Sequence, residues 1–411
     1  MAQDCVYVAM PMPHTTELVT TPTNPLLCDT TSPSAHTAGV RICSNEGNID
    51  DPRTLCRKKP RTSLNRNKSS YLSRVLLYDR LARTVKEEGF EGIWVSVGRS
   101  VQLLPLNASK ANPIVRILFT KAWPLCLLNG AGYEVCCGMS SGDIVWIDPV
   151  SARYSRINKA GNLTRAPVTA LCWFDSAKAQ IIAGHADGSV VVYDLDKDDG
   201  PLCSPLPALK PQVYLQVFAS ESPLSNPVLA FKISSAPITE LKVLDDCIIG
   251  TSRDGYLRCL DWTHNSIHSI VSSKFGGLLS MAVSPDGRYL AIGGEDDTIH
   301  LYQYPLMLHV CDLTGHTSWV RRIQFDAFAC DVKSHYYRLA SVGEDGKLLL
   351  WEFTTQGLLG TTNIYPFGSI QPTLPRIPKV PLSDVILHEH AIDVVGSDGR
   401  IWCWQRPTDK L

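Results

Sequence analysis

The chain has 411 residues, of which 44% are hydrophobic and 19% charged. This is an ordinary globular composition for one large domain or two to three small ones. The 39 basic and 40 acidic side chains give a net charge of −1, which offers little support for general nucleic-acid binding. No apolar run approaches the roughly 18–20 residues that cross a bilayer. The N-terminus has an early acid and no basic stretch, unlike a secretory signal. We therefore expect a cytoplasmic or nuclear protein without membrane or nucleic-acid partners.

The first 69 residues differ from the rest of the chain. They are rich in Thr, Pro, Ser and Asn and show no sustained hydrophobic period, which predicts a disordered tail. The tail carries a basic cluster that fits either a nuclear-import signal or a solvated linker, and we favour the linker because short basic runs are common. The cluster comprises Arg57, Lys58, Lys59, Arg61, Arg66 and Lys68.

Fourteen cysteines are spread along the chain. None are spaced CxxC, Cys136 and Cys137 are adjacent, and several lie inside apolar runs. Paired spacing is the usual sign of zinc ligation, and disulfides are rare in the cytosol and nucleus. The sequence therefore predicts small buried thiols.

From residue 70 onward a unit of an apolar run, a tight acidic-glycine turn and a second apolar run recurs. Six copies are legible: SSGDIVWID (140–148), HADGSVVVYD (185–194), SRDGYLRCLD (252–261), GEDDTIHLYQ (294–303), GEDGKLLLWE (343–352) and GSDGRIWCWQ (396–405). The apolar runs are too short for amphipathic helices, and Asp-Gly turns accept the positive φ of a tight hairpin. A period of roughly 40–50 residues built of short strands is typical of a WD-repeat β-propeller.

We predict an all-β, seven-bladed propeller over residues 70–408. The first blade, at 92–118, is atypical because it lacks the Asp-Gly turn. The last repeat supplies only three strands, and we expect residues 73–78 to add the fourth and so remove an exposed edge. Residues 79–88 are predicted to form a short helix. Two proline-rich insertions, 197–227 and 363–381, are predicted loops.

Three motifs with catalytic or metal-binding potential receive structural interpretations. Residues 138–142 match GxSxG, but a strand follows at once where a nucleophile elbow needs a helix. His388 and His390 share one strand face without an evident third ligand. Asp296 and Asp297 look like paired carboxylates, but they occupy the turn position that other repeats fill with Asp-Gly. We therefore predict no enzyme, no cofactor and no metal.

The sixth repeat contains a set of residues that resembles the WD-repeat hydrogen-bond tetrad. His316 begins the repeat, Ser341 lies on its second strand, Asp345 in the following turn and Trp351 on the third strand. Trp can donate to Ser, Ser can relay to His, and His can bond the Asp that fixes the turn. Because each partner sits at its repeat position, we interpret His316 as structural. The other blades lack most of this set, so we expect the sixth blade to be the most rigid.

Five stretches carry a family resemblance, which covers about residues 70–408. They are ILFTKAWPL (117–125), FGGLLSMAVSPDGRYLAIGGEDDTIHLYQYPL (275–306), GHTSWVRRIQFD (315–326), YYRLASVGEDGKLLLWEF (336–353) and DGRIWCWQRP (398–407). They closely resemble the WD-repeat regulators of ubiquitin-specific proteases, the family of the fungal catabolite-repression protein CreC and its animal counterparts. The resemblance implies a non-catalytic partner that binds and activates a ubiquitin-specific protease of the CreB type, together with a second WD-repeat subunit. In fungi it implies a role in carbon catabolite repression.

Two aromatic residues are the predicted anchors for such a partner. Phe275 and Trp319 both precede the first strand of a repeat, so they should open on one propeller face in adjacent blades. Large aromatics in such loops either fill a pocket on a partner or pack between blades. The resemblance places protease contacts at these two positions, with Arg253 and Lys274 nearby to meet acidic groups. Activation then requires that the propeller prefer the protease's competent conformation.

Other functions also fit a propeller. A substrate adaptor of a ubiquitin ligase would read its substrate with the same face and would need a ligase-recruiting element outside the propeller. A propeller hydrolase would need a polar or metal-lined central channel. A general assembly scaffold is the remaining alternative.

Overall fold

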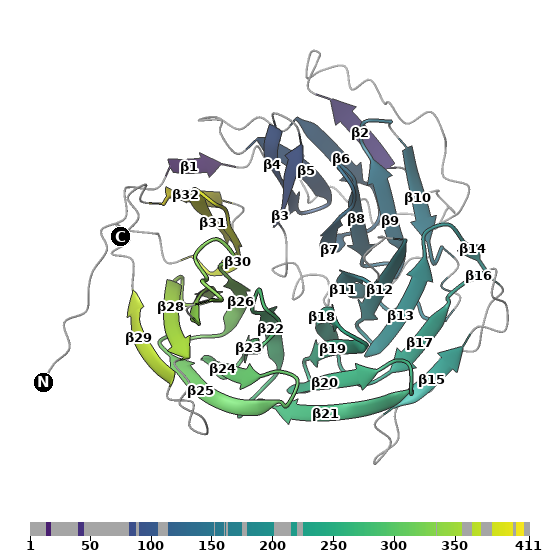
Figure 1. Ribbon diagram of the computed structural model, residues 1–411. Coiled ribbons are helices and arrows are strands. Elements are labelled where there is room, and N and C mark those ends of the chain that lie inside the picture. The colour runs from purple at the N-terminus through teal and green to yellow at the C-terminus, as the bar shows by residue number, and fades with distance from the viewer. Residues whose placement is uncertain are drawn as a thin grey trace, which may run out of the picture.

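The computed structural model describes residues 14–17, 40–44, 82–87, 90–105, 114–151, 153–159, 161, 163–174, 179–200, 215–219, 225–333, 335–355, 364–370, 380–397 and 400–406. Within these ranges every regular element is a β-strand. Most of the strands fall into seven antiparallel sheets, which we call blades 1 to 7 in chain order. The prediction of an all-β, seven-bladed propeller is confirmed (Figure 1).

The first three blades contain the following strands. Blade 1 holds β3 (Ala82–Glu87), β4 (Phe90–Val97), β5 (Ser100–Pro105) and β6 (Val115–Phe119). Blade 2 holds β7 (Pro124–Asn129), β8 (Val135–Met139), β9 (Ile144–Asp148) and β10 (Arg153–Ile157). Blade 3 holds β11 (Val168–Trp173), β12 (Gln180–His185), β13 (Ser189–Asp194) and β17 (Leu229–Lys232).

The remaining four blades complete the ring. Blade 4 holds β18 (Ile238–Leu244), β19 (Cys247–Ser252), β20 (Tyr256–Asp261) and β21 (Ser266–Ser272). Blade 5 holds β22 (Leu278–Val283), β23 (Tyr289–Gly294), β24 (Thr298–Gln303) and β25 (Leu308–Thr314). Blade 6 holds β26 (Val320–Phe325), β27 (Tyr336–Gly343), β28 (Leu348–Thr355) and β29 (Ile364–Ile370). Blade 7 holds β30 (Leu382–Leu387), β31 (Ala391–Gly396), β32 (Arg400–Gln405) and β1 (His14–Glu17).

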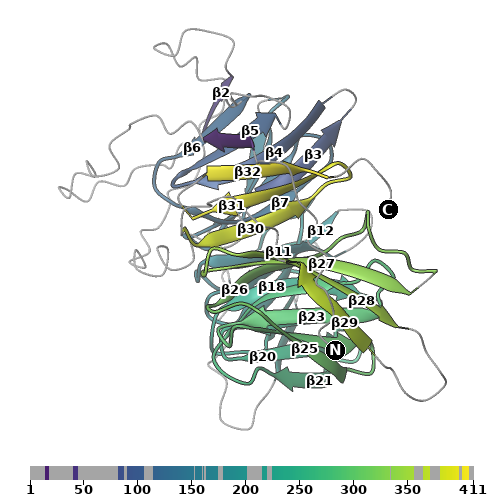
Figure 2. The same cartoon turned by 90° about the vertical axis from the view of Figure 1, so that its left-hand side faces the viewer.

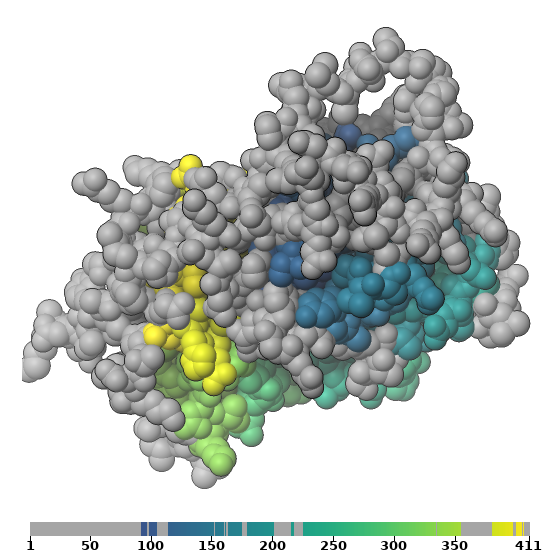
Figure 3. Space-filling view, turned by 90° about the horizontal axis from the view of Figure 1, so that it is seen from above, coloured from purple at the N-terminus to yellow at the C-terminus, as the bar shows by residue number. Residues whose placement is uncertain are grey.

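The innermost strands contact one another in sequence order around the ring, and β30 of blade 7 contacts β3 of blade 1. Seen from the side, blade 7 lies between blade 1 and blade 6 (Figure 2). The space-filling view from above likewise shows residues of blade 7 in yellow beside the green residues of blade 6 (Figure 3). The sheets therefore close on themselves, as a propeller requires.

The turns between second and third strands have the backbone that the repeats predict. Gly142, Gly188, Gly255 and Gly346 have φ between 72° and 87°, and Asp297 has φ 57°. At Gly188 a Cβ atom would lie 2.0 Å from the carbonyl oxygen of Ser234 in the next connection. Glycine is therefore required there by space as well as by conformation. Gly399, at the turn of the last repeat, lies outside the described residues.

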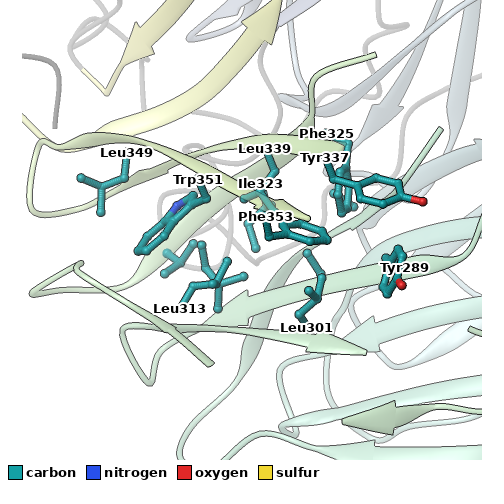
Figure 4. Packing of buried hydrophobic residues seen from close by; sticks show 14 residues of the cluster. Tyr289, Leu301, Leu313, Ile323, Phe325, Tyr337, Leu339, Leu349, Trp351 and Phe353 are labelled. Carbon is teal, nitrogen blue, oxygen red and sulfur yellow. The ribbon is translucent and has the colours of Figure 1, made fainter. Parts of the chain in front are cut away.

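Hydrophobic cores lie between adjacent blades, and the core shared by blades 5 and 6 is the most aromatic. Its residues come from both sheets, so that side chains of one blade pack on the face of the next (Figure 4). Tyr337 stacks on Phe353 with ring centroids 5.1 Å apart, and Tyr289 meets both rings edge-on. Burial of such large apolar side chains between neighbouring sheets stabilises the propeller.

Blade 1 corrects one expectation. Residues 79–88 were predicted as a helix, but Ala82–Glu87 form strand β3, paired antiparallel with β4. The helix prediction is wrong because pairing with a buried neighbour overrides the local preference of a short polar segment. The atypical sequence of this blade, at 92–118, otherwise forms the three predicted strands β4, β5 and β6.

The strand beside β32 is β1, paired from His14↔Cys403 to Glu17↔Arg400. It occupies the place that we predicted for residues 73–78, which lie outside the described residues. A second N-terminal strand, β2 (Val40–Ser44), pairs with β6 at the edge of blade 1. Two segments of the region 1–69, predicted to be a tail, thus form strands, while the basic cluster at residues 57–68 lies outside the described residues.

Both insertions contain strands. In the first, β15 (Gln216–Ala219) extends the edge of blade 3 beyond β17, and β14 (Asp198–Asp199) pairs with β16 (Ser225–Asn226). In the second, residues Ile364–Ile370 form β29, the outer strand of blade 6, rather than a loop. In both cases the preceding blade presents an edge whose backbone groups accept another strand.

Candidate protein-binding site

Phe275 lies in the connection between β21 and β22, and its side chain is 75% exposed. The loop that carries it is nonetheless held in place. Ser273 Oγ donates to the carbonyl of Gly276 over 2.7 Å, and the Gly277 N–H donates to Glu295 Oε2 over 3.0 Å. Gly276 has φ 67°, and a Cβ there would lie 2.7 Å from Glu295 Cβ. A fixed loop therefore presents a large apolar ring to solvent, rather than packing it between blades.

Trp319 lies in the equivalent connection of the next blade, between β25 and β26, and is half-buried. The guanidinium of Arg253, from the turn between β19 and β20, lies 5.9 Å from the centroid of its ring. Arg253 Nη2 also donates to Glu295 Oε1 over 3.2 Å. Glu295 thus connects the loop of Phe275 with the cation that covers Trp319.

Lys274 completes the set of predicted contact residues. Its backbone N–H donates to Asp296 Oδ2 over 3.3 Å and its ammonium contacts Asp312, while the side chain remains 65% exposed. Arg253, Lys274, Phe275 and Trp319 all lie in connections that open at the same ends of the antiparallel sheets of blades 4, 5 and 6. We call these four residues the docking face, after the role that the sequence predicts for them.

The tetrad residues of blade 6 form one hydrogen-bonded chain. Trp351 Nε1–H donates to Ser341 Oγ over 2.8 Å, and Ser341 Oγ lies 2.8 Å from His316 Nε2. His316 Nδ1 lies 3.1 Å from both carboxylate oxygens of Asp345. Burial alone would raise the pKa of Asp345, but hydrogen bonds from His316 and from the backbone hold it below its ordinary value. These side chains are buried, and the arrangement fixes the turn that precedes β28.

Blades 4 and 5 replace this tetrad in ways that the repeat pattern does not reveal. In blade 4, Ser234 takes the position next to the turn aspartate, with its Oγ 2.7 Å from Asp254 Oδ2. In blade 5, Asp296 is bonded by His300 from β24, whose Nε2 lies 2.7 Å away, instead of by a histidine from the preceding connection. Asp296 is therefore a buried structural carboxylate of the turn.

The centre of the ring contains an ion-pair network that the sequence analysis missed. Arg322 Nη1 of β26 lies 2.8 Å from Glu240 Oε1 of β18, and Arg322 Nε lies 3.3 Å from Asp384 Oδ1 of β30. The second oxygen of Glu240 accepts from the Met281 N–H over 2.8 Å. One arginine thus links the inner strands of blades 4, 6 and 7. The only signal in the sequence is a charged residue in each of three first strands.

The motifs examined for chemistry have structural places. Gly138–Gly142 spans the end of β8 and the turn to β9, without a following helix. His388 is buried and its Nε2 lies 2.9 Å from Asp393 Oδ2, whereas His390 is exposed. The described cysteines are all free thiols, and burial raises the pKa of Cys136 and Cys137. None of these groups has the geometry of an activated nucleophile.

Comparison with known proteins agrees with this fold. Residues 247–303 match the family described as WD domain, G-beta repeat. The chain is a β-propeller that contains this repeat. The structure also resembles a chain in the crystal structure of the mitotic checkpoint complex, with TM-score 0.58 and 13% identity over 91% of this chain and 97% of that one. At that identity the likeness concerns the fold alone. Among the described residues, no helix has the length and apolarity to cross a membrane.

Two relatives extend the resemblance found in the sequence. The chain is 28% identical to the UBP9-binding protein bun62 of Schizosaccharomyces pombe over 83% of this chain and 76% of that protein. It is 26% identical to the WD repeat-containing protein 20 homolog of Caenorhabditis elegans over 52% of this chain, which spans only 30% of the worm protein. The predicted similarity to WD-repeat partners of ubiquitin-specific proteases is thus confirmed as a similarity.

Proposed function

We propose that this WD-repeat propeller is a non-catalytic partner of a ubiquitin-specific protease of the CreB type. It binds the protease through the docking face and stabilises the catalytically competent conformation of that enzyme. A second WD-repeat subunit joins the complex, and in a fungal cell the complex serves carbon catabolite repression. Because a partner activates only by preferring the active state, this role requires no chemistry on the propeller itself.

The observation that carries the proposal is the exposed ring of Phe275 on a loop that Glu295 holds in place. A large aromatic side chain on a rigid loop loses little conformational entropy when it enters a pocket on a partner. Trp319 and its covering arginine lie on the adjacent blade, so that apolar anchors and rim charges share one face. Interface hot spots have this composition. The similarity to a protein named for binding UBP9 supports the same class of partner.

The proposal is tested with Phe275→Ala and Trp319→Ala. Phe328→Ala is the matched control, because Phe328 is also exposed but lies between β26 and β27, at the opposite ends of the sheets. Each docking-face variant should weaken binding of a purified CreB-type protease by about 30-fold, equivalent to about 2 kcal/mol. The control should bind as the unchanged chain does.

The rate of ubiquitin-substrate hydrolysis at saturating propeller separates activation from simple recruitment. Under the proposal the unchanged chain raises this rate. Equal binding by all four proteins would remove Phe275 and Trp319 from the interface. Affinity purification that returns ligase subunits in place of a deubiquitinase would instead favour the substrate-adaptor function.

A further inference from the structure

A cluster of two histidines and one aspartate, none of them a docking-face residue, lies on the outer strands of blade 5. His300 is on β24, and His309 and Asp312 are on β25. His300 Nδ1 lies 2.6 Å and His309 Nε2 2.8 Å from the same oxygen, Asp312 Oδ1. The three potential ligand atoms all lie within 4.8 Å of one another. We propose that His300, His309 and Asp312 form a binding site for a divalent transition metal, of which zinc is the best fit.

Two imidazole nitrogens and one carboxylate oxygen are a ligand set that zinc accepts, with a fourth position left for water or another ligand. Bond lengths of about 2.0–2.1 Å in a tetrahedral site place ligand atoms about 3.3 Å apart. The two short contacts must therefore lengthen by about 0.5–0.7 Å. Rotation of the His309 side chain, 47% exposed, can lengthen its own contact, and rotation of the Asp312 side chain, 24% exposed, can lengthen the contact with the buried His300. Entry from solvent is open on that side. The metal replaces the proton between His300 Nδ1 and Asp312, and this proton is released.

A second observation concerns the other ring nitrogen of His300, which contacts Asp296. Its Nε2 lies 2.7 Å from Asp296 Oδ2, and both side chains are almost fully buried. A metal-binding histidine commonly donates its other ring N–H to a carboxylate, which fixes the orientation of the ring. Here that contact turns Nδ1 toward the other two ligands. Asp296 is itself fixed, because it holds the turn and accepts from the backbone of Lys274.

A second group of the same residue types lacks this support. On blade 4, Asp261 is contacted by His264 at 2.7 Å and by His268 at 3.5 Å. Both histidines are mainly exposed, 80% and 62%. Neither is shown bonded to a second carboxylate, so this group offers a control for adventitious binding by surface histidines.

Lys274 connects the metal cluster with the docking face. Its ammonium contacts Asp312 Oδ2, beside the proposed ligand atom, and repels a bound cation. Since this side chain is 65% exposed, it can turn away from Asp312 when a metal binds. Metal therefore competes with the Lys274 ion pair, and replacement of Lys274 by a neutral residue should strengthen metal binding.

The test uses the full chain without a histidine tag, stripped of metal by a chelator. Zinc is titrated by calorimetry, and cobalt(II) is followed by its visible absorption as a tetrahedral probe. We expect one zinc ion per chain, a tenfold or greater loss of affinity in His309→Ala, unchanged affinity in His264→Ala, and tighter binding in Lys274→Met. Calcium, which prefers oxygen ligands, should not compete.

Because His309 is half-exposed, His309→Ala should unfold at the same temperature as the unchanged chain without metal, which separates lost ligation from lost folding. Failure of the unchanged chain to bind zinc would overturn the proposal. Equal zinc affinity of His309→Ala and His264→Ala would overturn it as well, by showing adventitious binding only.

Discussion

Arg253 and Glu295 form an ion pair between the turns of two adjacent blades, with Nη2 and Oε1 3.2 Å apart. Each partner also fixes one anchor of the docking face. Glu295 accepts from the backbone of the Phe275 loop, and Arg253 covers the ring of Trp319. The pair therefore helps to order the surroundings of both aromatic residues, and under the proposed function this order reduces the entropy lost when the protease binds.

Replacement of Glu295 by alanine should weaken protease binding while Phe275 and Trp319 remain present. Loss of the loop hydrogen bond and of the contact to Arg253 should cost about 1 kcal/mol, or roughly fivefold in affinity. The unfolding temperature should fall only modestly, because the variant removes one ion pair and one loop hydrogen bond and leaves the hydrophobic cores between the blades intact. Calorimetric titration with the protease measures the first effect and a thermal melt the second.

The control for this variant is Glu352→Ala, which removes the carboxylate paired with Arg338 in a comparably exposed position of blade 6. It should leave protease binding unchanged. If both alanine variants bind the protease equally, Glu295 has no role in ordering the docking face.

Arg322→Met should strongly destabilise the ring. It leaves the buried carboxylates of Glu240 and Asp384 without their shared cation, and breaking a buried ion pair from one side costs about 3–5 kcal/mol. Denaturant unfolding should show this as a lower midpoint. The double variant Arg322→Met with Glu240→Gln should recover part of the loss, since one buried charge is then removed. If the double variant loses as much stability as the two single variants together, the two residues are not directly coupled.

Ser341→Ala should destabilise blade 6 by about 1–3 kcal/mol, the cost of buried polar groups left without partners. The substitution removes the acceptor of Trp351 Nε1–H and the partner of His316 Nε2. Thermal unfolding measures the change, and amide exchange in β27 and β28 locates it. Ser266→Ala, on the exposed edge strand β21, is the control and should have little effect. Equal melting temperatures for both variants would contradict the importance of the tetrad.

His185 makes stability dependent on pH. Burial lowers its pKa below 6.5, an effect that outweighs the nearby charge of Asp187. A histidine whose folded-state pKa is lowered contributes stability above the unfolded-state pKa, about 6.5, and this contribution is lost as pH falls toward the folded-state pKa. The difference in unfolding free energy between the unchanged chain and His185→Gln should therefore decrease as the pH is lowered from about 7 to about 5. A pH-independent difference would exclude this linkage.

The sequence predicts the propeller well where a local signal defines a strand. Asp-Gly turns demand positive φ, and they correctly bracket β12 with β13 and β27 with β28. The tetrad contacts could be predicted for the same reason, because the spacing of His316, Ser341, Asp345 and Trp351 follows the repeat.

Other elements depend on partners far away in the chain. Ala82–Glu87 becomes a strand only by pairing with β4, and several N-terminal segments could have supplied the strand beside β32. The exposure of Phe275 depends on the hydrogen bond between its loop and Glu295. This contact joins two connections, and the repeat pattern gives no sign of it. The Arg322 ion-pair network could not be predicted, because the sequence does not reveal which inner strands face one another across the ring.

The pairing of β1 with β32 has a consequence for biosynthesis. A ribosome makes β32 almost four hundred residues after β1. Six blades can assemble while translation continues. The seventh cannot be completed until β32 emerges, and until then β31 exposes an unpaired edge. Chaperones that shield such edges are therefore expected to act on this chain until β32 has been made and has paired.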